Sequence, residues 1–231
     1  MKTKNTNSSK KVVLVGDSGC GKTSIISTFM NKDSTTAKDN LLTTKHTPTI
    51  FDVYTATSTL HKDTKCNFTI HDTAGLEVYD RLRPLSYPDT DLILLCFSIA
   101  DPDSLRNIVD KWLPEIRHNC PNKPYILIGT KSDLRADDRI VRTLSRRAKQ
   151  EPVSRLQGLK LAKQMKALKY IECSSLDNET VQCLFEYVTK KIVKTKSNGN
   201  FISTLNLAFR MFKRQIKLSA IQYKPEDEEL Q

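Results

Sequence analysis

Long apolar runs are missing from this 231-residue sequence, and no stretch approaches the roughly 20 apolar residues that a membrane-spanning helix needs. Paired cysteine spacing is missing as well. The six cysteines are scattered, which excludes a disulfide framework and favours reduced thiols in a core. No apolar segment follows the polar start of the chain, so we expect residues 1–10 to form a disordered arm and not a signal peptide. These absences favour a cytoplasmic protein.

Lipid anchors lack their sequence signals too. Lys2 stands where N-myristoylation requires glycine, and no cysteine follows Cys183, so we expect neither myristoylation nor prenylation. Positive charge is in excess, with 37 lysines and arginines against 26 acidic residues. No zinc-ligand spacing, helix-turn-helix signal or aromatic-interleaved basic motif accompanies this charge, so we expect no nucleic-acid partner. With 38% hydrophobic residues, the chain can bury one sizeable core and carry tails.

Glycines are few, seven in all, yet three of them stand within residues 16–21. That segment fits G-x-x-x-x-G-K-[ST] and lies between an apolar run over 12–15 and a helical pattern over 24–30. The pattern predicts a phosphate-cradling loop at a helix N-terminus. In such a loop Lys22 reaches the β- and γ-phosphate oxygens, and Thr23 offers its hydroxyl to Mg²⁺. The predicted nucleotide-binding residues here are Gly16, Asp17, Ser18, Gly19, Cys20, Gly21, Lys22, Thr23 and Ser24.

Two more short strings follow apolar strands. The first is Asp72, Thr73, Ala74 and Gly75, in which Asp72 is placed to approach Mg²⁺ through water. The second is Thr130, Lys131, Ser132 and Asp133. The carboxylate of Asp133 can accept hydrogen bonds from N1–H and the N2 amino group of guanine, whereas adenine lacks that amino group and its N1 is an acceptor. The second string therefore favours GTP over ATP, and it disfavours an ATP-dependent kinase or ATPase.

Apolar strand runs alternate with helical patterns along most of the chain. We expect strands near 11–16, 52–61, 65–71, 92–98, 124–129 and 169–173, and helices near 22–31, 103–118, 155–167 and 178–194. This alternation predicts an α/β fold: a six-stranded, mostly parallel sheet flanked by helices, with ligands at the carboxyl ends of the strands. All three strings fall at such ends, which is consistent with one pocket.

Further segments resemble the Rho-type members of the Ras-like small GTPases, which have a P-loop NTPase fold. Residues 79–88 resemble their switch II, residues 48–52 their switch I core, and residues 172–176 their last guanine-contacting loop. Residues 137–150 stand where that subfamily carries an inserted helix. The likeness covers about residues 11–193, so we expect a GTPase domain over 11–194.

The resemblance implies a molecular switch in signalling that binds GTP or GDP with Mg²⁺. It implies that Thr49 binds the metal and Gly75 the γ-phosphate, so that both switch segments relax when this phosphate is lost. It also implies that backbone groups of Ser174 and Ser175 meet the guanine. Effector proteins, an exchange factor and an activator protein are the implied partners. The implied effector-binding residues are His46, Thr47, Pro48, Ile50, Phe51, Asp52, Val53 and Tyr54.

The catalytic positions implied by the resemblance are Lys22, Thr49 and Leu76, and the last of these departs from the family pattern. Leu76 replaces the glutamine that orients the attacking water, and Ser18 replaces a glycine beside which an activator's arginine enters. We therefore expect weak GTP hydrolysis, as in a binding module held in its GTP-bound shape. The alternative is a normally cycling GTPase whose water is positioned without the glutamine.

Two further departures flank the core of the domain. The polar segment over 33–45 makes the chain before switch I longer than the family pattern, and His46 stands where a tyrosine is usual. Residues 195–231 replace the prenylation box with a basic amphipathic helix and an acidic end. The helical pattern over 201–218 suits an anionic membrane surface at the cytoplasmic face, with docking against the domain or a partner helix as the alternatives.

Overall fold

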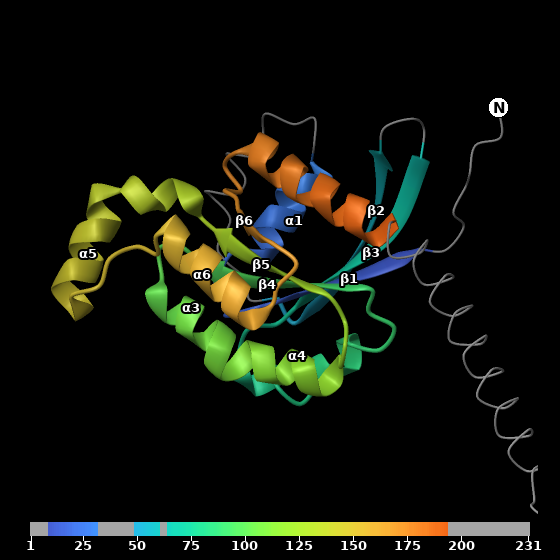
Figure 1. Cartoon of the computed structure of the whole chain (residues 1–231), viewed down its shortest axis with the longest axis horizontal. Coiled ribbons are helices and arrows are strands. Elements are labelled where there is room, and N and C mark those ends of the chain that lie inside the picture. Colours follow the sequence, from blue (N-terminus) through green and yellow to red (C-terminus); the bar gives the residue numbers. More distant parts are fainter. Residues whose placement is uncertain (1–8, 32–48, 61–63, 194–231) are drawn as a thin grey trace, which may run out of the picture. The chain divides into compact units, whose positions relative to one another are not determined.

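The computed structural model describes residues 9–31, 49–60 and 64–193, and Figure 1 shows how they are arranged. One sheet of six strands has the order β2-β3-β1-β4-β5-β6. Its strands are β1 (Lys10–Val15), β2 (Phe51–Leu60), β3 (Thr64–Thr73), β4 (Leu92–Ser98), β5 (Tyr125–Thr130) and β6 (Tyr170–Glu172). All neighbours are parallel except β2 and β3, which are antiparallel. The predicted six-stranded, mostly parallel sheet is confirmed.

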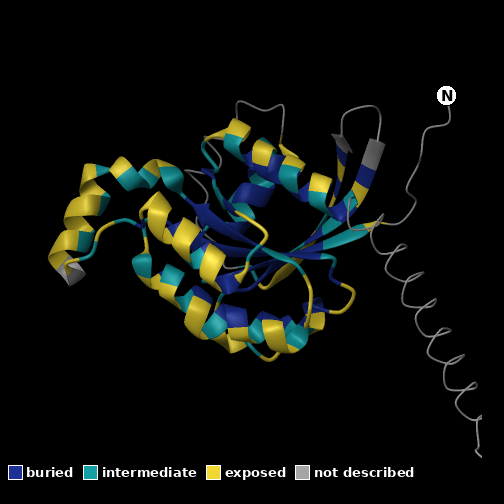
Figure 2. Cartoon of the chain, viewed as in Figure 1, coloured by how far each residue is buried: buried dark blue, intermediate teal, exposed yellow. Residues whose placement is uncertain are grey.

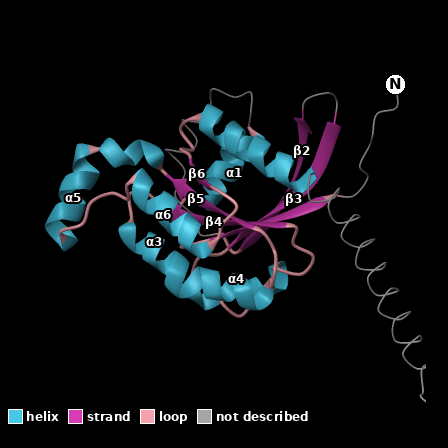
Figure 3. Cartoon of the chain, in the orientation of Figure 1, coloured by secondary structure: helices cyan, strands magenta, loops and turns pink. Residues whose placement is uncertain are grey.

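Helices cover both faces of this sheet. The helices of the described residues are α1 (Lys22–Met30), α3 (Pro102–Asn107), α4 (Leu113–Asn119), α5 (Asp138–Ala148), α6 (Arg155–Met165) and a last helix over 178–193. Figure 3 shows α1 and the last helix on one side of the sheet and α3, α4 and α6 on the other. Short 3-10 turns lie at Glu77–Tyr79, Arg83–Ser86 and Ser132–Ala136. Within the described part of the chain, no helix is long and apolar enough to cross a membrane.

Each face of the sheet has its own apolar core. On one face Phe29 of α1 stacks on Phe185 of the last helix at 3.9 Å between ring centroids, next to Phe68 of β3. On the other face Trp112 and Met165 pack among the inward residues of β1, β4 and β5. Strand β4 lies at the centre and all seven of its residues are buried, as expected for a strand covered on both sides. Figure 2 shows the central strands in dark blue, whereas the exposed residues, in yellow, lie mainly on the helices and on the edge of the sheet.

The helix predicted over 103–118 is interrupted. A π-helical segment, Ile108–Trp112, separates α3 from α4. Pro114 in the first turn of α4 has no N–H to donate to a carbonyl in the preceding turn, so regular α-helical hydrogen bonding cannot continue through this point. The predicted helix over 103–118 is thus confirmed as a helical segment over 102–119, and its π-helical part was not predicted.

The predicted inserted segment contains a helix, α5, which lies apart from the sheet in Figure 1. Its N-terminus is capped by Asp137, whose carboxylate accepts hydrogen bonds from the N–H groups of Arg139 and Ile140. Other predictions lie outside the described residues. These are residues 1–8 of the predicted arm, the segment over 33–45, the switch I residues His46, Thr47 and Pro48, and the C-terminal segment over 195–231. Lys10, which was predicted to belong to the arm, is the first residue of β1.

Candidate nucleotide-binding site

The loop between β1 and α1 has a backbone that favours glycine. Gly16, Gly19 and Gly21 have φ angles of 151°, 71° and 99°, in a region that L side chains rarely adopt. A Cβ on Gly16 would also lie 2.0 Å from the carbonyl oxygen of Cys96. The loop leads directly into the N-terminus of α1, where the unpaired N–H groups and the helix dipole favour an anion. This geometry suits a phosphate group.

Lys22 holds the loop from its inner side. Its buried Nζ donates at 2.8 Å to the carbonyl oxygens of both Gly16 and Asp17. A third and weaker contact, of 3.9 Å, goes to Sγ of Cys20, and a phosphate oxygen would be a far better acceptor. Burial raises the pKa of the Cys20 thiol, so this cysteine is protonated and unreactive at neutral pH.

Oxygen atoms suited to Mg²⁺ converge beside the loop. Oγ1 of Thr23 lies 2.8 Å from Oγ1 of Thr49 and donates at 2.5 Å to Oδ2 of Asp72. The other carboxylate oxygen of Asp72 is buried and has no hydrogen-bond partner among the described residues. Burial raises the pKa of Asp72, and the hydroxyl of Thr23 and the charge of Lys22 oppose this. Hydroxyl and carboxylate oxygens are the ligands that Mg²⁺ takes, so the residues present fit this ion.

A small polar cavity joins the phosphate loop to both switch segments. It is lined by Ser18, Gly19, Gly21, Lys22, Thr23, Ser24, Thr49, Thr73 and Gly75. Gly75 lies so close to the phosphate loop that a Cβ would be 2.1 Å from the backbone nitrogen of Ser18. The hydroxyl of Thr73 donates to the carbonyl oxygen of Leu14 at 2.6 Å, and the carbonyl oxygen of Ala74 accepts from Arg83. The structure thus brings the first two predicted strings together.

The third string lies on the adjacent loop after β5. Lys131 has a left-handed backbone, with φ of 55°, and its Nζ donates to the carbonyl oxygen of Gly19 at 2.7 Å. The hydroxyl of Thr130 is within hydrogen-bonding distance of the carbonyl oxygen of Cys20. Asp133 lies exposed in the following turn, where its Oδ1 accepts from the hydroxyl of Ser174. These contacts place the predicted base-reading residues directly beside the phosphate loop.

The loop after β6 brings in the last predicted residues. The N–H of Ser132 donates to the carbonyl oxygen of Cys173 at 3.2 Å, which ties this loop to the one after β5. The hydroxyl of Thr28 in α1 donates to the carbonyl oxygen of Ser175 at 2.9 Å. Helix α1 also begins at the phosphate loop, so the same helix contacts both the phosphate loop and the loop after β6.

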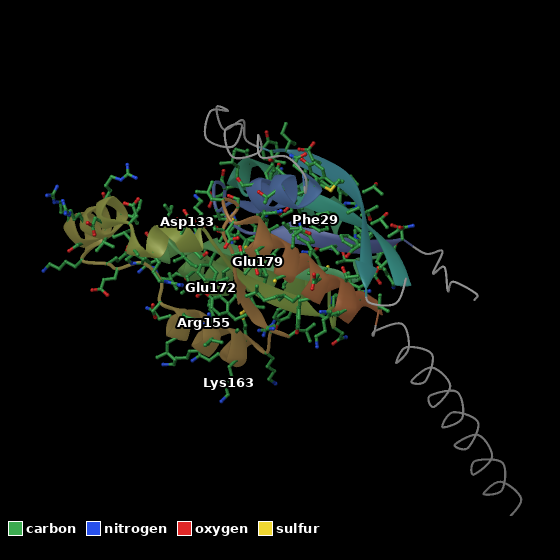
Figure 4. The ribbon with its side chains drawn as sticks, turned by 90° about the horizontal axis from the view of Figure 1, so that it is seen from above. Phe29, Asp133, Arg155, Lys163, Glu172 and Glu179 are labelled. Atoms are coloured by element: carbon green, nitrogen blue, oxygen red, sulfur yellow. The ribbon has the colours of Figure 1, made fainter. Side chains whose placement is uncertain are left out.

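An ion pair that the sequence analysis did not identify supports these two loops. The guanidinium of Arg135 donates two hydrogen bonds, of 2.9 and 2.6 Å, to the carboxylate of Glu172. The hydroxyl of Tyr170 donates to the same carboxylate at 2.8 Å. Arg135 follows Asp133 by two positions and Glu172 precedes Ser174 by two, and Figure 4 labels both Asp133 and Glu172. A sequence signal for this ion pair therefore existed. A basic residue lies two positions after Asp133 and an acidic residue two positions before Ser174, and these two motif residues follow neighbouring strands.

The segment over 76–87, which includes most of the predicted switch II and is called switch II below, combines one buried anchor with an exposed apolar surface. The fully buried guanidinium of Arg83 donates to the carbonyl oxygens of Ala74 and Leu76, at 2.8 and 3.2 Å, and to Glu115 at 2.8 Å. The side chain of Leu76 is partly exposed, next to Gly75. Arg83 therefore anchors switch II at one point, whereas the side chain at the predicted catalytic position is an alkyl group that can neither donate nor accept a hydrogen bond.

Switch I residues that the structure describes line an adjoining apolar cavity. Ile50 and Phe51 form one wall, and Tyr79, Leu82 and Leu85 of switch II contribute to the other, around about 300 Å³. Asp52, Val53 and Tyr54 follow on β2, where Asp52 is opposite Asp72 of β3. Of the predicted effector-binding residues, Ile50 and Phe51 line this cavity together with switch II, and Asp52, Val53 and Tyr54 are not among its lining residues. Apolar side chains that are exposed together in this way are typical of a protein–protein contact surface.

Two donors to Asp17 were also missed by the sequence analysis. Nδ2 of Asn107 donates at 2.7 Å to one carboxylate oxygen of Asp17, and Nε1 of Trp112 donates at 2.6 Å to the other. Both donors lie about ninety positions from Asp17 in the sequence, and no local pattern connects them with it. Only the tertiary structure reveals this contact.

Fold and site together define a P-loop nucleotide-binding protein of the α/β class. A family model described as the Ras family matches residues 11–194 of the chain. The chain therefore belongs to the Ras family and is a small GTP-binding switch. Proteins of this family generally bind GTP or GDP with Mg²⁺, in agreement with the oxygen cluster around Thr23.

Proposed function

We propose that this protein is a Rho-type switch that binds GTP with Mg²⁺, hydrolyses it slowly and recruits effector proteins while GTP is bound. Leu76 is the observation that carries slow hydrolysis. Leu76 directly follows Gly75, which lines the cavity beside the phosphate loop, and an alkyl side chain cannot orient a water molecule. Catalysis of phosphoryl transfer is largely positioning and charge stabilisation, so the missing amide removes a central part.

The remaining residues of the site support binding. Lys22 would hold the β- and γ-phosphates, Thr23 and Thr49 would ligate Mg²⁺, and Asp72 would hold its water ligands. Mg²⁺ supplies charge neutralisation of the phosphates when it is bound. Asp133 would read the guanine edge, with its position set by Ser174.

The Rho-type assignment and the effector surface rest on two features. Helix α5 lies between β5 and α6, where the Rho-type subfamily has its inserted helix. The apolar cavity between Phe51 and Leu82 connects the two switch segments, so an effector that covers it would sense both at once. We propose that effectors bind there and that the exposed Ile50 and Leu85 contact them directly.

Nucleotide analysis and a restored glutamine test this proposal together. Purified protein is denatured and the released nucleotide is identified by chromatography, with GTP expected as the main species. Single-turnover hydrolysis is then compared for the wild type and Leu76→Gln, for which we expect a rate at least about tenfold higher. Val78→Gln is the matched control, since Val78 is 78% exposed on the same segment but is not adjacent to Gly75. A wild-type rate equal to that of Leu76→Gln would show that water is positioned without the glutamine.

A further inference from the structure

The carboxylate of Asp17 is fixed at both of its oxygens. Asn107 donates to Oδ2 at 2.7 Å and Trp112 donates to Oδ1 at 2.6 Å. The backbone carbonyl of the same residue accepts from Lys22 at 2.8 Å and from the N–H of Cys20 at 3.3 Å. Hydrogen bonds thus hold both the side chain and the backbone of Asp17. The peptide groups of the phosphate loop are oriented by contacts that involve no ligand.

Both donors to Asp17 come from the same helical segment of the chain. They can reach the same carboxylate because part of this segment is π-helical. Residues five apart in a regular α-helix point about 140° away from each other around the helix axis, since each turn takes 3.6 residues. Asn107 and Trp112 are five apart, and the π-helical i→i+5 register over Ile108–Trp112 brings positions with this spacing onto one side. Single π-helical turns within α-helices frequently occur at functional sites.

The indole of Trp112 has a second contact on its face. The guanidinium of Arg83 lies 4.5 Å from the centre of the ring, and Nζ of Lys111 lies 4.9 Å from it. Trp112 and the guanidinium of Arg83 are both buried, so this contact is protected from water, whereas Lys111 is partly exposed. Because Arg83 also holds the carbonyl oxygens on either side of Gly75, one indole connects the phosphate loop to switch II.

We propose that Asn107 and Trp112 are positioning residues for the phosphate loop: the π-helical segment directs both at Asp17 and so fixes the loop that binds the β-phosphate. The inference rests on the proposed nucleotide binding and adds the residues that pre-organise it. A loop already held in its binding shape loses less conformational entropy when the ligand arrives. Removing either donor therefore weakens nucleotide binding although neither touches the nucleotide.

Release of fluorescently labelled GDP from the full-length protein in excess Mg²⁺ tests this inference. We expect Asn107→Ala and Trp112→Phe each to release GDP about tenfold faster than the wild type, since each loses one hydrogen bond to a charged group. The phenyl ring of the second variant retains an aromatic face for Arg83. Asn119→Ala is the matched control, because its side chain donates only to a backbone carbonyl in the same helix, that of Glu115 at 2.9 Å, and we expect a change below twofold.

A double-mutant cycle separates positioning from general stability. If Asn107 acts through Asp17, adding Asn107→Ala to Asp17→Ala increases the release rate by less than twofold. Release at the wild-type rate from both single variants would overturn the inference and leave the proposed function intact. A full tenfold effect in the Asp17→Ala background would also overturn it, because the asparagine would then act by another route. Failure of the wild type to bind GDP would overturn the proposed function together with this inference.

Discussion

The two ends of the candidate nucleotide site are built differently. On the base side, Arg135, Tyr170 and Glu172 form a hydrogen-bonded cluster, and Tyr170 is packed between two glycines of neighbouring elements. On the switch side, Leu76 and Leu85 expose apolar side chains. Segments with few buried contacts open at low free-energy cost, whereas a satisfied buried cluster resists opening. We therefore expect the base side of the site to belong to the fixed fold and the switch side to open more readily.

Gly158→Ala disrupts the packing on the base side of the site. Of all the substitutions, we expect it to lower the free energy of unfolding most. A Cβ on this residue of α6 would lie 2.1 Å from Cζ of Tyr170, whose hydroxyl is only 2.7 Å from where a Cβ on Gly129 would be. The ring has no room to retreat, so the gain in helix propensity is outweighed by overpacking. We expect the free energy of unfolding to fall by about 2–3 kcal/mol, measured by urea denaturation.

A compensating substitution controls for this effect. Tyr170→Leu removes the ring that Gly158→Ala would meet, so the double variant should lose less stability than the sum of the two single variants. If the losses were additive, Gly158 of α6 would not be tightly packed against the ring of Tyr170. The base side of the site would then be no more rigidly packed than the switch side.

Glu172→Gln tests the charge of the same cluster. The carboxylate is largely buried and the guanidinium of Arg135 partly so, and we expect the free energy of unfolding at pH 7 to fall by about 1–3 kcal/mol. Burial raises the pKa of Glu172, but hydrogen bonds from Arg135 and Tyr170 outweigh it and hold the pKa below its ordinary value of 4.5. The stabilisation is therefore fully present above pH 4.5 and is lost as the pH falls through the lowered pKa.

The free energy of unfolding, measured from pH 7 down to pH 3, checks the direction of this pH dependence. The difference between the wild type and Glu172→Gln should shrink as the pH falls, because protonation of the wild-type carboxyl also removes the ion pair. Glu186→Gln serves as the control, since Glu186 and Lys190 form an exposed pair of 3.6 Å that contributes little. A difference that stays constant with pH would show that the charge of Glu172 does not stabilise this region.

The sequence predicts most of the fold because the signals that build it are local. Apolar runs mark the strands, and the glycine pattern at 16–21 marks the phosphate loop. Contacts between distant segments carry no such local signal, and the donors to Asp17 were found only in the structure. The π-helical segment was missed for a related reason: its residues continue a helical pattern, and the one-residue change in hydrogen-bond register leaves no separate mark.

Gly75→Ala tests the switch side of the comparison between the two ends of the site. We expect it to change the free energy of unfolding less than the other substitutions do. A Cβ here would meet the backbone of Asp17 and Ser18, at 2.3 and 2.1 Å, so switch II must shift away from the phosphate loop. We expect the free energy of unfolding to fall by about 1 kcal/mol, less than for Gly158→Ala, because the clash lies between two loops and not between a helix and the sheet.

In Gly75→Ala we expect the protein to stay folded but switch II to lose its response to the bound nucleotide. Trp112 is the single tryptophan of the chain and lies under Arg83 of switch II, so its fluorescence reports the position of that segment. In the wild type we expect emission to differ between the GDP complex and the complex with a non-hydrolysable GTP analogue. In Gly75→Ala the two spectra should coincide, because switch II can no longer close against the phosphate loop. A loss of stability as large as that of Gly158→Ala would instead show that switch II belongs to the fixed core.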